Sequence, residues 1–169
     1  MENFINIIKV RTPDQIRSLA QLAADIWREH YTAIIGREQV EYMLDKFQSA
    51  EAIAGQIENE GYEYCLIRYQ GQDAGYLALV PDAEERTMLL SKIYVHGTMR
   101  GRGLGKQALQ FAIDDCRERG FQKLWLTVNK YNSDSIAWYE RQGFTNAGPL
   151  ITDIGGGFVM DDYRMELIL

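Results

Sequence analysis

The sequence predicts an α/β protein built on a central mixed, mostly antiparallel sheet of about seven strands, with helices on both faces. Three observations predict this class. The hydrophobic period changes from helical to strand-like near Gly61, a hairpin signal at Gln70-Gly71-Gln72 excludes a purely parallel sheet, and helices alternate with strands after Thr87. The 169 residues have the length of one domain, residues 1–169, which can bury a substantial core.

The N-terminal third is predicted to be mainly helical. A short strand at Asn6–Val10 comes first. A helix then begins at Pro13, because Thr12 suits the N-cap and Asp14 suits the positive end of the helix dipole. Its apolar residues recur at helical spacing as far as Trp27. Two further helices are expected, at Glu38–Phe47 and Ala50–Glu58.

The rest of the chain reads mainly as strands, interrupted by two helices. A helix is expected at Gly103–Arg119, and Gly120 directly after it suits a left-handed C-terminal cap. A second helix is expected at Asp134–Gln142 and ends at Gly143. After Phe144 the tail supplies one or two more strands. The other strands are expected at Tyr62–Tyr69, Asp73–Val80, Thr87–His96 and Lys123–Val128.

Composition excludes several classes. The chain carries 18 Lys and Arg against 24 Asp and Glu, a net charge of −6, which argues against a nucleic-acid binder and mildly favours cationic ligands. No apolar stretch approaches the ~18 residues of a membrane span, and residues 1–4 lack the basic start of a signal peptide. Cys65 and Cys116 lie in apolar patterns, as expected of buried thiols in a cytoplasmic protein. The two His and two Cys share no ligand spacing, so no metal site is predicted.

A glycine-rich turn at Met99–Lys106 carries the most information. It lies between a predicted strand and the helix that follows, and its three glycines allow several backbone N–H groups to point at one place. The helix N-terminus adds partial positive charge, and Arg100, Arg102 and Lys106 add full charges. We interpret the turn as a phosphate or pyrophosphate site; the alternative is an ordinary strand-to-helix turn with solvated arginines.

Two other phosphate-binding motifs fit the turn poorly. A Walker A loop requires Ser or Thr after its Lys, but Gln107 follows Lys106, and Arg100 occupies the first glycine position. A relaxed dinucleotide motif fits Gly103–Ala108, but the next strand ends at Asn129 without an acidic residue for a ribose. Only about 60 residues follow the motif, too few for the rest of a dinucleotide-binding domain.

The spacing Arg100-x-x-Gly103-x-Gly105 resembles the acetyl-CoA pyrophosphate loop of the GNAT N-acetyltransferase superfamily. A second block follows the pattern Asn-x-x-Ala/Ser-x-x-x-Tyr-x-Lys/Arg-x-Gly-Phe of the same family, and the resemblance is good over residues 87–144. It implies a single GNAT domain that moves an acetyl group from acetyl-CoA to a primary amine in a ternary complex. The residues on the second pattern are Asn132, Ser135, Tyr139, Arg141, Gly143 and Phe144.

The resemblance also implies roles for individual residues. Backbone groups of Ile93 and Val95 on the central strand would pair with the pantetheine arm, and the Val95 N–H would polarise the thioester carbonyl. Tyr139 would be the general acid, since a neutral phenol can donate its proton to the leaving sulfur. Asn132 would contact the pantetheine or a bound water, besides serving as a helix N-cap. The implied acetyl-CoA-binding set is Ile93, Tyr94, Val95, Arg100, Gly101, Arg102, Gly103, Leu104, Gly105, Lys106, Asn129, Asn132 and Ser135.

The chain departs from the family pattern at one position. Many members carry a Glu on the central strand as general base, whereas Leu89–Lys92 contains no carboxylate. The base is therefore left unassigned. At the end of the first long helix, where the family usually builds its acceptor site, Glu29, His30 and Tyr31 are the candidate substrate residues, although each is more often a solvated or capping residue.

Within the family, the chain most resembles the bacterial polyamine (spermidine/spermine) acetyltransferase branch, at Ile26–Tyr31, Tyr42–Leu44 and Met160–Met165. A small-molecule amine is thus the expected acceptor. The alternatives are a protein or peptide amine, a CoA-sensing binding module and a nucleotide-binding regulator. Apolar residues on the last strands leave a homodimer open. The acidic residues that could attract a polycation are Glu29, Glu41, Asp45, Asp153, Asp161 and Asp162, with solvated surface carboxylates as the alternative.

Overall fold

The computed structural model describes residues 5–169. The helices are α1 (Pro13–Ile35), α2 (Arg37–Phe47), α3 (Ala50–Asn59), α4 (Leu104–Glu118) and α5 (Ser133–Arg141), with a short 3-10 turn at Gly97–Met99. The strands are β1 (Asn6–Lys9), β2 (Glu63–Tyr69), β3 (Gln72–Asp82), β4 (Thr87–Val95), β5 (Lys123–Asn129), β6 (Thr145–Gly155) and β7 (Phe158–Ile168). Each predicted element is present, the tail forms two strands, and the first helix continues past Tyr31 to Ile35. Residues 1–4, on which the signal-peptide expectation depends, lie outside the described part.

The strands form one seven-stranded sheet in the order β1-β2-β3-β4-β5-β7-β6. Every neighbouring pair is antiparallel except β4 and β5, which are parallel. The prediction of a mixed, mostly antiparallel sheet is therefore confirmed. The parallel pair arises because α4 carries the chain from the end of β4 back to the start of β5, as a parallel connection requires.

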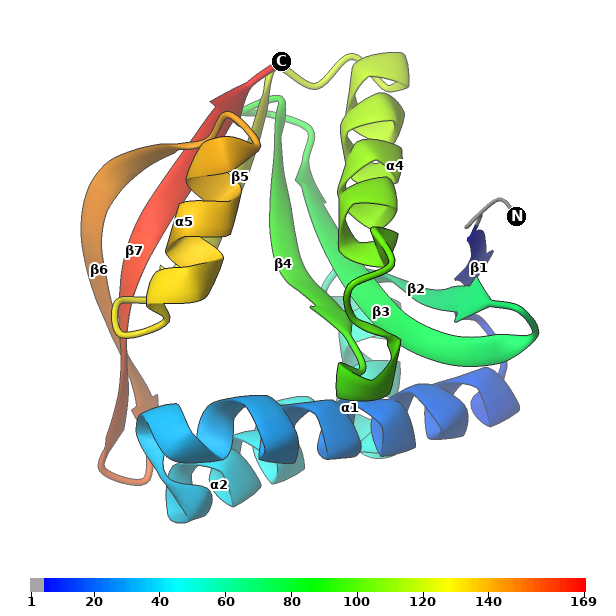
Figure 1. Cartoon of the computed structure of the whole chain (residues 1–169), viewed down its shortest axis with the longest axis vertical. Coiled ribbons are helices and arrows are strands. Elements are labelled where there is room, and N and C mark those ends of the chain that lie inside the picture. The colour runs from blue at the N-terminus through cyan, green and yellow to red at the C-terminus, as the bar shows by residue number, and fades with distance from the viewer. Residues whose placement is uncertain (1–4) are drawn as a thin grey trace.

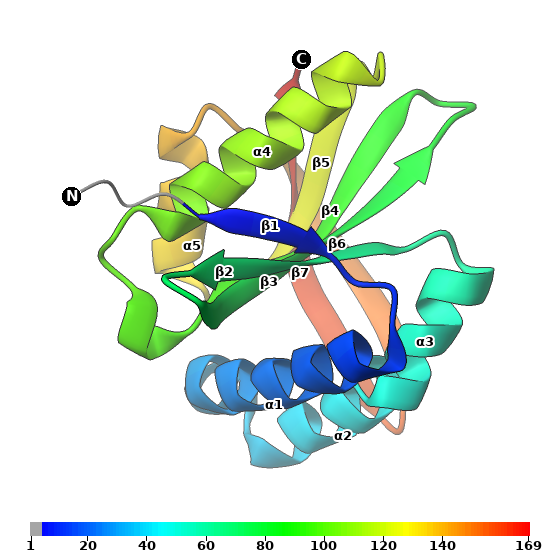
Figure 2. The ribbon, with the colours of Figure 1, turned by 90° about the vertical axis from the view of Figure 1, so that its right-hand side faces the viewer.

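Helices cover both faces of the sheet, as predicted. Figure 2 shows α4 above the sheet and α1, α2 and α3 below it. One buried cluster joins α4 to the sheet through residues such as Leu109 and Leu126. The other joins α1, α2 and α3 to the opposite face through residues such as Ile26, Met43 and Ile53. Each helix buries one apolar stripe, which is how an amphipathic helix is stabilised on a sheet.

The helix ends follow the local chemistry of the sequence. Thr12 and Gln15 form a reciprocal capping box at the start of α1. At the end of α4, the N–H of Gly120 donates to Arg117 and that of Phe121 donates to Cys116, the pattern of a left-handed glycine cap. The N-cap at Thr12 and the glycine cap at Gly120 were predicted from neighbouring residues, whereas the return bond to the Gln15 side chain was not.

Strands β4 and β5 separate after a short paired segment. They pair only at Thr87–Leu89 with Lys123–Trp125. Next to this segment Ser91 is an extra residue in β4, since Leu90 pairs with Leu79 but Lys92 pairs with Ala78 on β3. The bulge and the short pairing leave the remaining part of β4 separated from β5. Figure 1 shows α4 and α5 in front of the sheet and α1 crossing beneath it.

A buried polar chain ties α1 and the α2–α3 connection to the sheet. Trp27 donates its indole N–H to the Tyr76 hydroxyl (2.7 Å), which donates to Gln48 (2.8 Å). Gln48 in turn donates to the Tyr64 hydroxyl (2.9 Å), which donates to Gln56 (2.6 Å). Every polar atom of a buried network must find a partner, so this chain fixes the helices in one position. This chain was not predicted from the sequence, because its members are distant along it.

Other expectations concern exposure and compartment. Cys65 and Cys116 are both free and buried, as predicted. Leu150, Ile151 and Val159 expose apolar surface on β6 and β7. The homodimer stays a prediction, and so does the cytoplasmic location. No helix in residues 5–169 is long and apolar enough to cross a membrane.

Candidate active site

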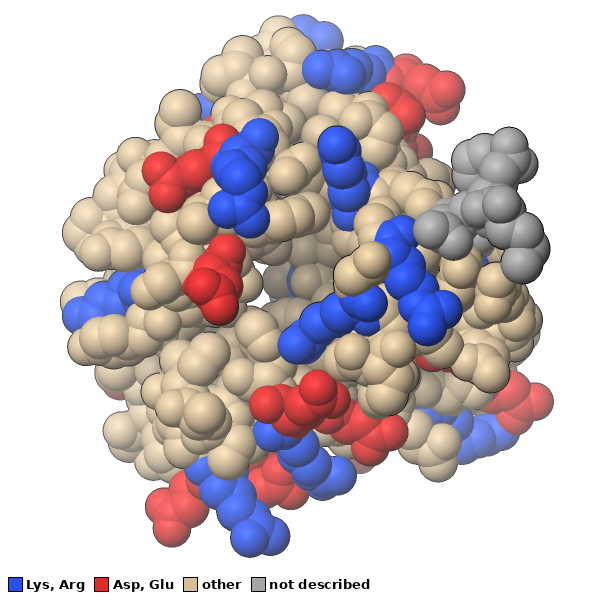
Figure 3. All heavy atoms as spheres, viewed as in Figure 1, with Lys and Arg blue, Asp and Glu red and all other residues tan. Residues whose placement is uncertain are grey.

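A cleft of about 730 Å³ opens where β4 and β5 separate. It extends between the bulged end of β4, the end of β5, the start of α5 and the last turns of α1. Figure 3 shows a hollow in this face with Lys and Arg side chains on several sides of it. Residues of the cleft wall include Ser91, Ile93, Tyr94, Val95, Arg100, Gly105, Thr127, Asn132, Ser135, Trp138, Tyr139 and Arg141.

The backbone of β4 presents polar groups to this cleft. The His96 N–H donates to Ala74 on β3 (2.7 Å). Because facing residues of an antiparallel pair alternate between bonded and non-bonded positions, Val95 and Ile93 turn their N–H and C=O groups away from β3. These groups therefore face the gap toward β5. The Arg100 side chain already donates to the Val95 carbonyl (3.4 Å).

The glycine-rich turn forms a site for an anion at the edge of the cleft. Gly101 and Gly103 have φ values of +81° and +74°, which residues with a side chain rarely adopt. Gly103 is the N-cap of α4, and no side chain in the described part of the chain caps this helix. The N–H groups of its first turn therefore remain available to a ligand, and the helix dipole favours a negative one.

The structure brings together part of the predicted acetyl-CoA set. Leu104 is only 2% exposed and packs with Tyr69 and Ala74, so its backbone alone can face a ligand. Asn129 lies away from the cleft, and its side chain accepts the N–H of Tyr131 (3.0 Å). The predicted residues that line the cleft are Ile93, Tyr94, Val95, Arg100, Gly105, Asn132, Ser135 and Tyr139; those that do not are Gly101, Arg102, Gly103, Leu104, Lys106 and Asn129.

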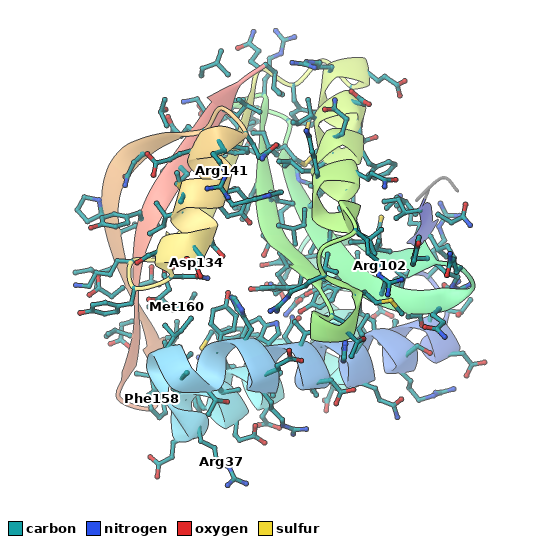
Figure 4. All side chains as sticks on the ribbon, viewed as in Figure 1. Arg37, Arg102, Asp134, Arg141, Phe158 and Met160 are labelled. Carbon is teal, nitrogen blue, oxygen red and sulfur yellow. The ribbon has the colours of Figure 1, made fainter. Side chains whose placement is uncertain are left out.

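The charged residues of the turn point in different directions. Arg100 lines the cleft, whereas the Arg102 guanidinium lies 5.6 Å from the ring centre of Tyr69. Figure 4 shows Arg102 beside the turn, and Arg141 and Asp134 on α5. Of these, Arg141 and Asp134 also line the cleft. The basic character predicted for the turn thus reaches the cleft itself through Arg100.

Tyr139 projects from α5 into the cleft. Its ring is partly buried and makes edge contacts with Trp138 and Phe144, with ring centres 5.2 and 5.6 Å apart. Burial, with a smaller effect of Tyr31, raises the pKa of the Tyr139 phenol well above its ordinary value. The phenol therefore stays protonated at neutral pH and can donate a proton.

Asn132 connects the start of α5 to α1. Its side-chain oxygen accepts the N–H of Ser135 (3.4 Å) as the N-cap of α5, and its amide nitrogen lies 3.1 Å from His30 Nε2. Burial and the nearby Arg100 lower the pKa of His30, so its ring is neutral at pH 7. Glu29 lies against Gly97 instead and lines no part of the cleft.

A second cavity of about 230 Å³ lies on the other side of the β4 bulge. Its walls come from α1, α2, β4, β5 and β7. The two cavities meet at their shared residues, where the hydroxyls of Tyr31 and Tyr94 are 2.8 Å apart. The residues that line both are Tyr31, Ser91, Lys92, Tyr94 and Thr127.

The second cavity contains two charged groups of opposite sign. Asp162 is 4% exposed, and burial, with the neighbouring Asp161, raises the pKa of its carboxyl to about 6, against a hydrogen bond from Thr127. Burial lowers the pKa of Lys92 to about 8. Lys92 was not predicted from the sequence, and Asp162 was not distinguished there from Asp161. No sequence pattern separates the two, since alternation places Asp162 in one row with Met160 but also with Arg164 and Glu166.

The other acidic residues proposed to attract a polycation lie elsewhere. Glu41 pairs with Arg28 (3.0 Å), and Asp161 pairs with Lys130. Glu29, Asp45 and Asp153 line neither cavity, so only Asp162 of that set lies within one. In residues 5–169 no cluster of three or more His, Cys, Asp or Glu side chains could hold a metal ion.

The sequence matches the model of the acetyltransferase (GNAT) family over residues 19–144. It is 27% identical to an uncharacterised N-acetyltransferase of the pepI 3' region of Lactobacillus delbrueckii subsp. lactis, over 98% of this chain and 95% of that one. It is also 32% identical to the ribosomal protein bS18-alanine N-acetyltransferase of Salmonella typhimurium, over 53% of this chain and 60% of that one.

Two solved structures share the fold across nearly the whole chain. The PaiA N-acetyltransferase of Thermoplasma acidophilum, in complex with coenzyme A, superposes with a TM-score of 0.77 at 20% identity, covering 98% of this chain and 99% of that one. A spermidine N-acetyltransferase chimera that includes the Vibrio cholerae enzyme superposes with a TM-score of 0.73 at 18% identity, covering 97% and 95%.

Proposed function

The chain belongs to the acetyltransferase (GNAT) family and is an acetyl-CoA-dependent N-acetyltransferase, and we propose that it acetylates a primary amine by direct attack in a ternary complex. One observation carries the proposal. The cleft and the second cavity meet at the bulge of β4, so two substrates can enter from opposite sides and touch there. Direct transfer then needs no acyl-enzyme, and both cysteines are buried.

Acetyl-CoA is assigned to the cleft. The unpaired N–H groups at the start of α4 and the Arg100 side chain would hold its pyrophosphate, and the backbone groups of Ile93 and Val95 would hold its pantetheine arm. Asn132 and Ser135 line the opposite wall. With acetyl-CoA bound in this way, the thioester would lie near the bulge.

The transfer chemistry uses groups on both sides of the thioester. The Val95 N–H, directed away from β3, would polarise the thioester carbonyl. The amine nitrogen forms a bond to the carbonyl carbon, the C–S bond breaks, and the leaving sulfur takes the proton of Tyr139. Burial keeps that phenol protonated until the thiolate forms.

The acceptor is assigned to the second cavity, with a polyamine as the first candidate. The fold shared with a spermidine N-acetyltransferase and the carboxylate of Asp162 in this cavity support that choice. A protein or peptide amine is the second candidate. The similarity to the ribosomal protein bS18-alanine N-acetyltransferase, over about half of the chain, supports it.

The deciding experiment measures release of the CoA thiol from acetyl-CoA by the purified protein with a panel of amines. The panel contains spermine, spermidine, short diamines, lysine, amino sugars and peptides with free N-termini. Saturable turnover on polyamines supports the first candidate, and turnover on peptides alone supports the second. Tight acetyl-CoA binding without turnover on any member would favour a CoA-sensing module, and binding of NAD or ATP in place of CoA would favour a nucleotide-binding regulator.

A further inference from the structure

We propose that Asp162 is the catalytic residue that binds the ammonium group of the acceptor and takes up its proton. The inference rests on the proposed function and goes beyond it by assigning a base. The central strand offers none, since Leu89–Lys92 contains no carboxylate. The assignment comes from β7, two strands away from β4 in the sheet.

Asp162 is a buried carboxylate to which residues 5–169 offer no ion-pair partner. Its neighbour Asp161 is paired with Lys130, but the structure shows no ion pair to Asp162 among residues 5–169. Strand alternation places Asp162 on the same face as Phe158 and Met160, which pack against the helices below the sheet. A buried charge is costly unless a partner compensates it. A ligand ammonium in the second cavity would supply that partner.

The position of Asp162 suits the reaction. It lines the second cavity, and Thr127, which hydrogen-bonds its carboxylate, lines both cavities. Tyr139 lines only the cleft. The proton acceptor would thus lie on the amine side of the thioester and the proton donor on the sulfur side. A proton acceptor and a proton donor in one site need different pKa values, and the different environments of Asp162 and Tyr139 provide them.

The groups around Asp162 shift the pKa of its carboxyl in opposing directions, and the upward shift is the larger. Tyr31 of α1 and Lys92 of β4 line the same cavity, Thr127 of β5 donates a hydrogen bond, and Asp161 adds negative charge next to it. Burial and Asp161 raise the pKa of Asp162 to about 6. A base is most effective when its pKa lies close to the working pH.

Asp162 and Tyr139 each handle one proton in the proposed step. The acceptor ammonium transfers one proton to the Asp162 carboxylate and becomes a neutral amine. The nitrogen then bonds to the thioester carbon and the C–S bond breaks, while the sulfur takes the phenol proton of Tyr139. The second nitrogen proton restores the phenol, and Asp162 returns its proton to solvent. The products are the amide, free CoA thiol and one proton in solution.

The cavity also limits the kind of amine. Its walls beyond Asp162 are mainly apolar and aromatic, and Lys92 places a cation on another wall. A second ammonium inside the cavity would be repelled by Lys92. We therefore expect an acceptor that inserts one ammonium on an alkyl chain, as the aminoalkyl end of a polyamine or of lysine does. The apolar wall residues are Trp27, Ile35, Met43, Phe47, Tyr62 and Met160.

The test compares Asp162→Asn with Asp161→Asn, a change in the adjacent carboxylate. The acceptor is n-butylamine, spermidine or the best amine of the panel. We expect Asp162→Asn to lower kcat/KM for the amine by about 100-fold or more, with little change in acetyl-CoA affinity, and Asp161→Asn to stay within about threefold of wild type. Equal effects of the two changes, or none, would overturn the assignment.

A pH profile distinguishes a base from a structural residue. Alkylamines titrate near the pKa of lysine, about 10.4, so their charge is constant between pH 5 and 8. The wild-type profile of kcat/KM should break near pH 6, the pKa expected for Asp162, and the profile of Asp162→Asn should lack this break. A break that persists in the variant would contradict the proposal.

A binding measurement separates this inference from the proposed function. In protein labelled with 13C at the aspartate side-chain carboxyl carbon, n-butylammonium should shift the Asp162 signal and leave Asp161 unchanged. A shift without turnover would support the cation site while the proposed acetyl transfer fails. Turnover without a shift at Asp162 would leave the acetyl transfer standing and overturn the inference.

Discussion

The hydroxyl groups of Tyr31 on α1 and Tyr94 on β4 lie 2.8 Å apart, where the cleft meets the second cavity. Their rings are in edge contact, with centres 5.9 Å apart. Burial raises the pKa of Tyr31 to about 12, so its phenol stays neutral and the two hydroxyls share a hydrogen bond. This contact joins the end of α1 to the strand that carries the bulge.

Replacing Tyr31 by Phe should weaken acceptor binding more than acetyl-CoA binding. The change leaves the Tyr94 hydroxyl without this partner and loosens a wall of the second cavity, at a cost of about 1–2 kcal/mol in the free energy of unfolding. Steady-state kinetics should show a several-fold increase in the KM of the amine. Tyr62→Phe, in the same cavity, is the control; a larger rise in the KM of acetyl-CoA than in that of the amine would contradict the expectation.

Tyr139→Phe removes the proposed general acid with little change in shape. The thiolate must then leave without a proton, and kcat should fall by about tenfold or more while the Kd of acetyl-CoA hardly changes. Tyr131→Phe, on the same cleft but largely exposed, should retain activity. Full turnover by the Tyr139 variant would exclude it as the acid.

Arg100→Ala tests the anion site at the glycine-rich turn. Arg100 lines the cleft, and a charge-assisted hydrogen bond to a phosphate is worth about 1.5–3 kcal/mol, so the Kd of acetyl-CoA should rise by about tenfold or more. The loss should shrink at high salt, because salt screens the attraction. Arg17→Ala, at an exposed pair with Asp14, should bind acetyl-CoA normally. Equal affinities of both variants would place the pyrophosphate elsewhere.

Asp162 should make stability fall as pH rises. Its pKa is raised from 3.8 to about 6 in the folded protein, so the folded state holds this proton more tightly than the unfolded state between pH 4 and 6. The free energy of unfolding should therefore lose about 3 kcal/mol across this window. Relative to wild type, Asp162→Asn should gain that amount between pH 4 and 7.

Urea unfolding at several pH values measures this difference. Asp161→Asn is the control, since its carboxylate belongs to a surface pair with Lys130 and should contribute less than about 1 kcal/mol. Parallel pH curves for wild type and Asp162→Asn would show that Asp162 is not desolvated as the structure indicates.

Local residue patterns determined the order and type of the elements. The capping box at Thr12 and the glycine cap at Gly120 depend on neighbours within a few residues, so both were predictable. The anion-binding character of the turn at Met99–Lys106 was equally predictable, because its glycines and basic residues are adjacent in the chain. The exact end of α1 was not, since its last turn extends beyond Tyr31 to Ile35.

The sequence by itself therefore determined the fold class, the family resemblance and the acetyl-CoA side of the site. The residues of that side lie in two continuous segments of the chain. Only the tertiary structure decided which of these residues share a cleft, and that Leu104 is buried and Asn129 faces another cavity. It alone separated Asp162 from Asp161 and placed Asp162 in the wall of one cavity with Lys92 and Tyr31. The reason is physical: burial and charge compensation depend on strands and helices that are distant in sequence, and no local spacing records them.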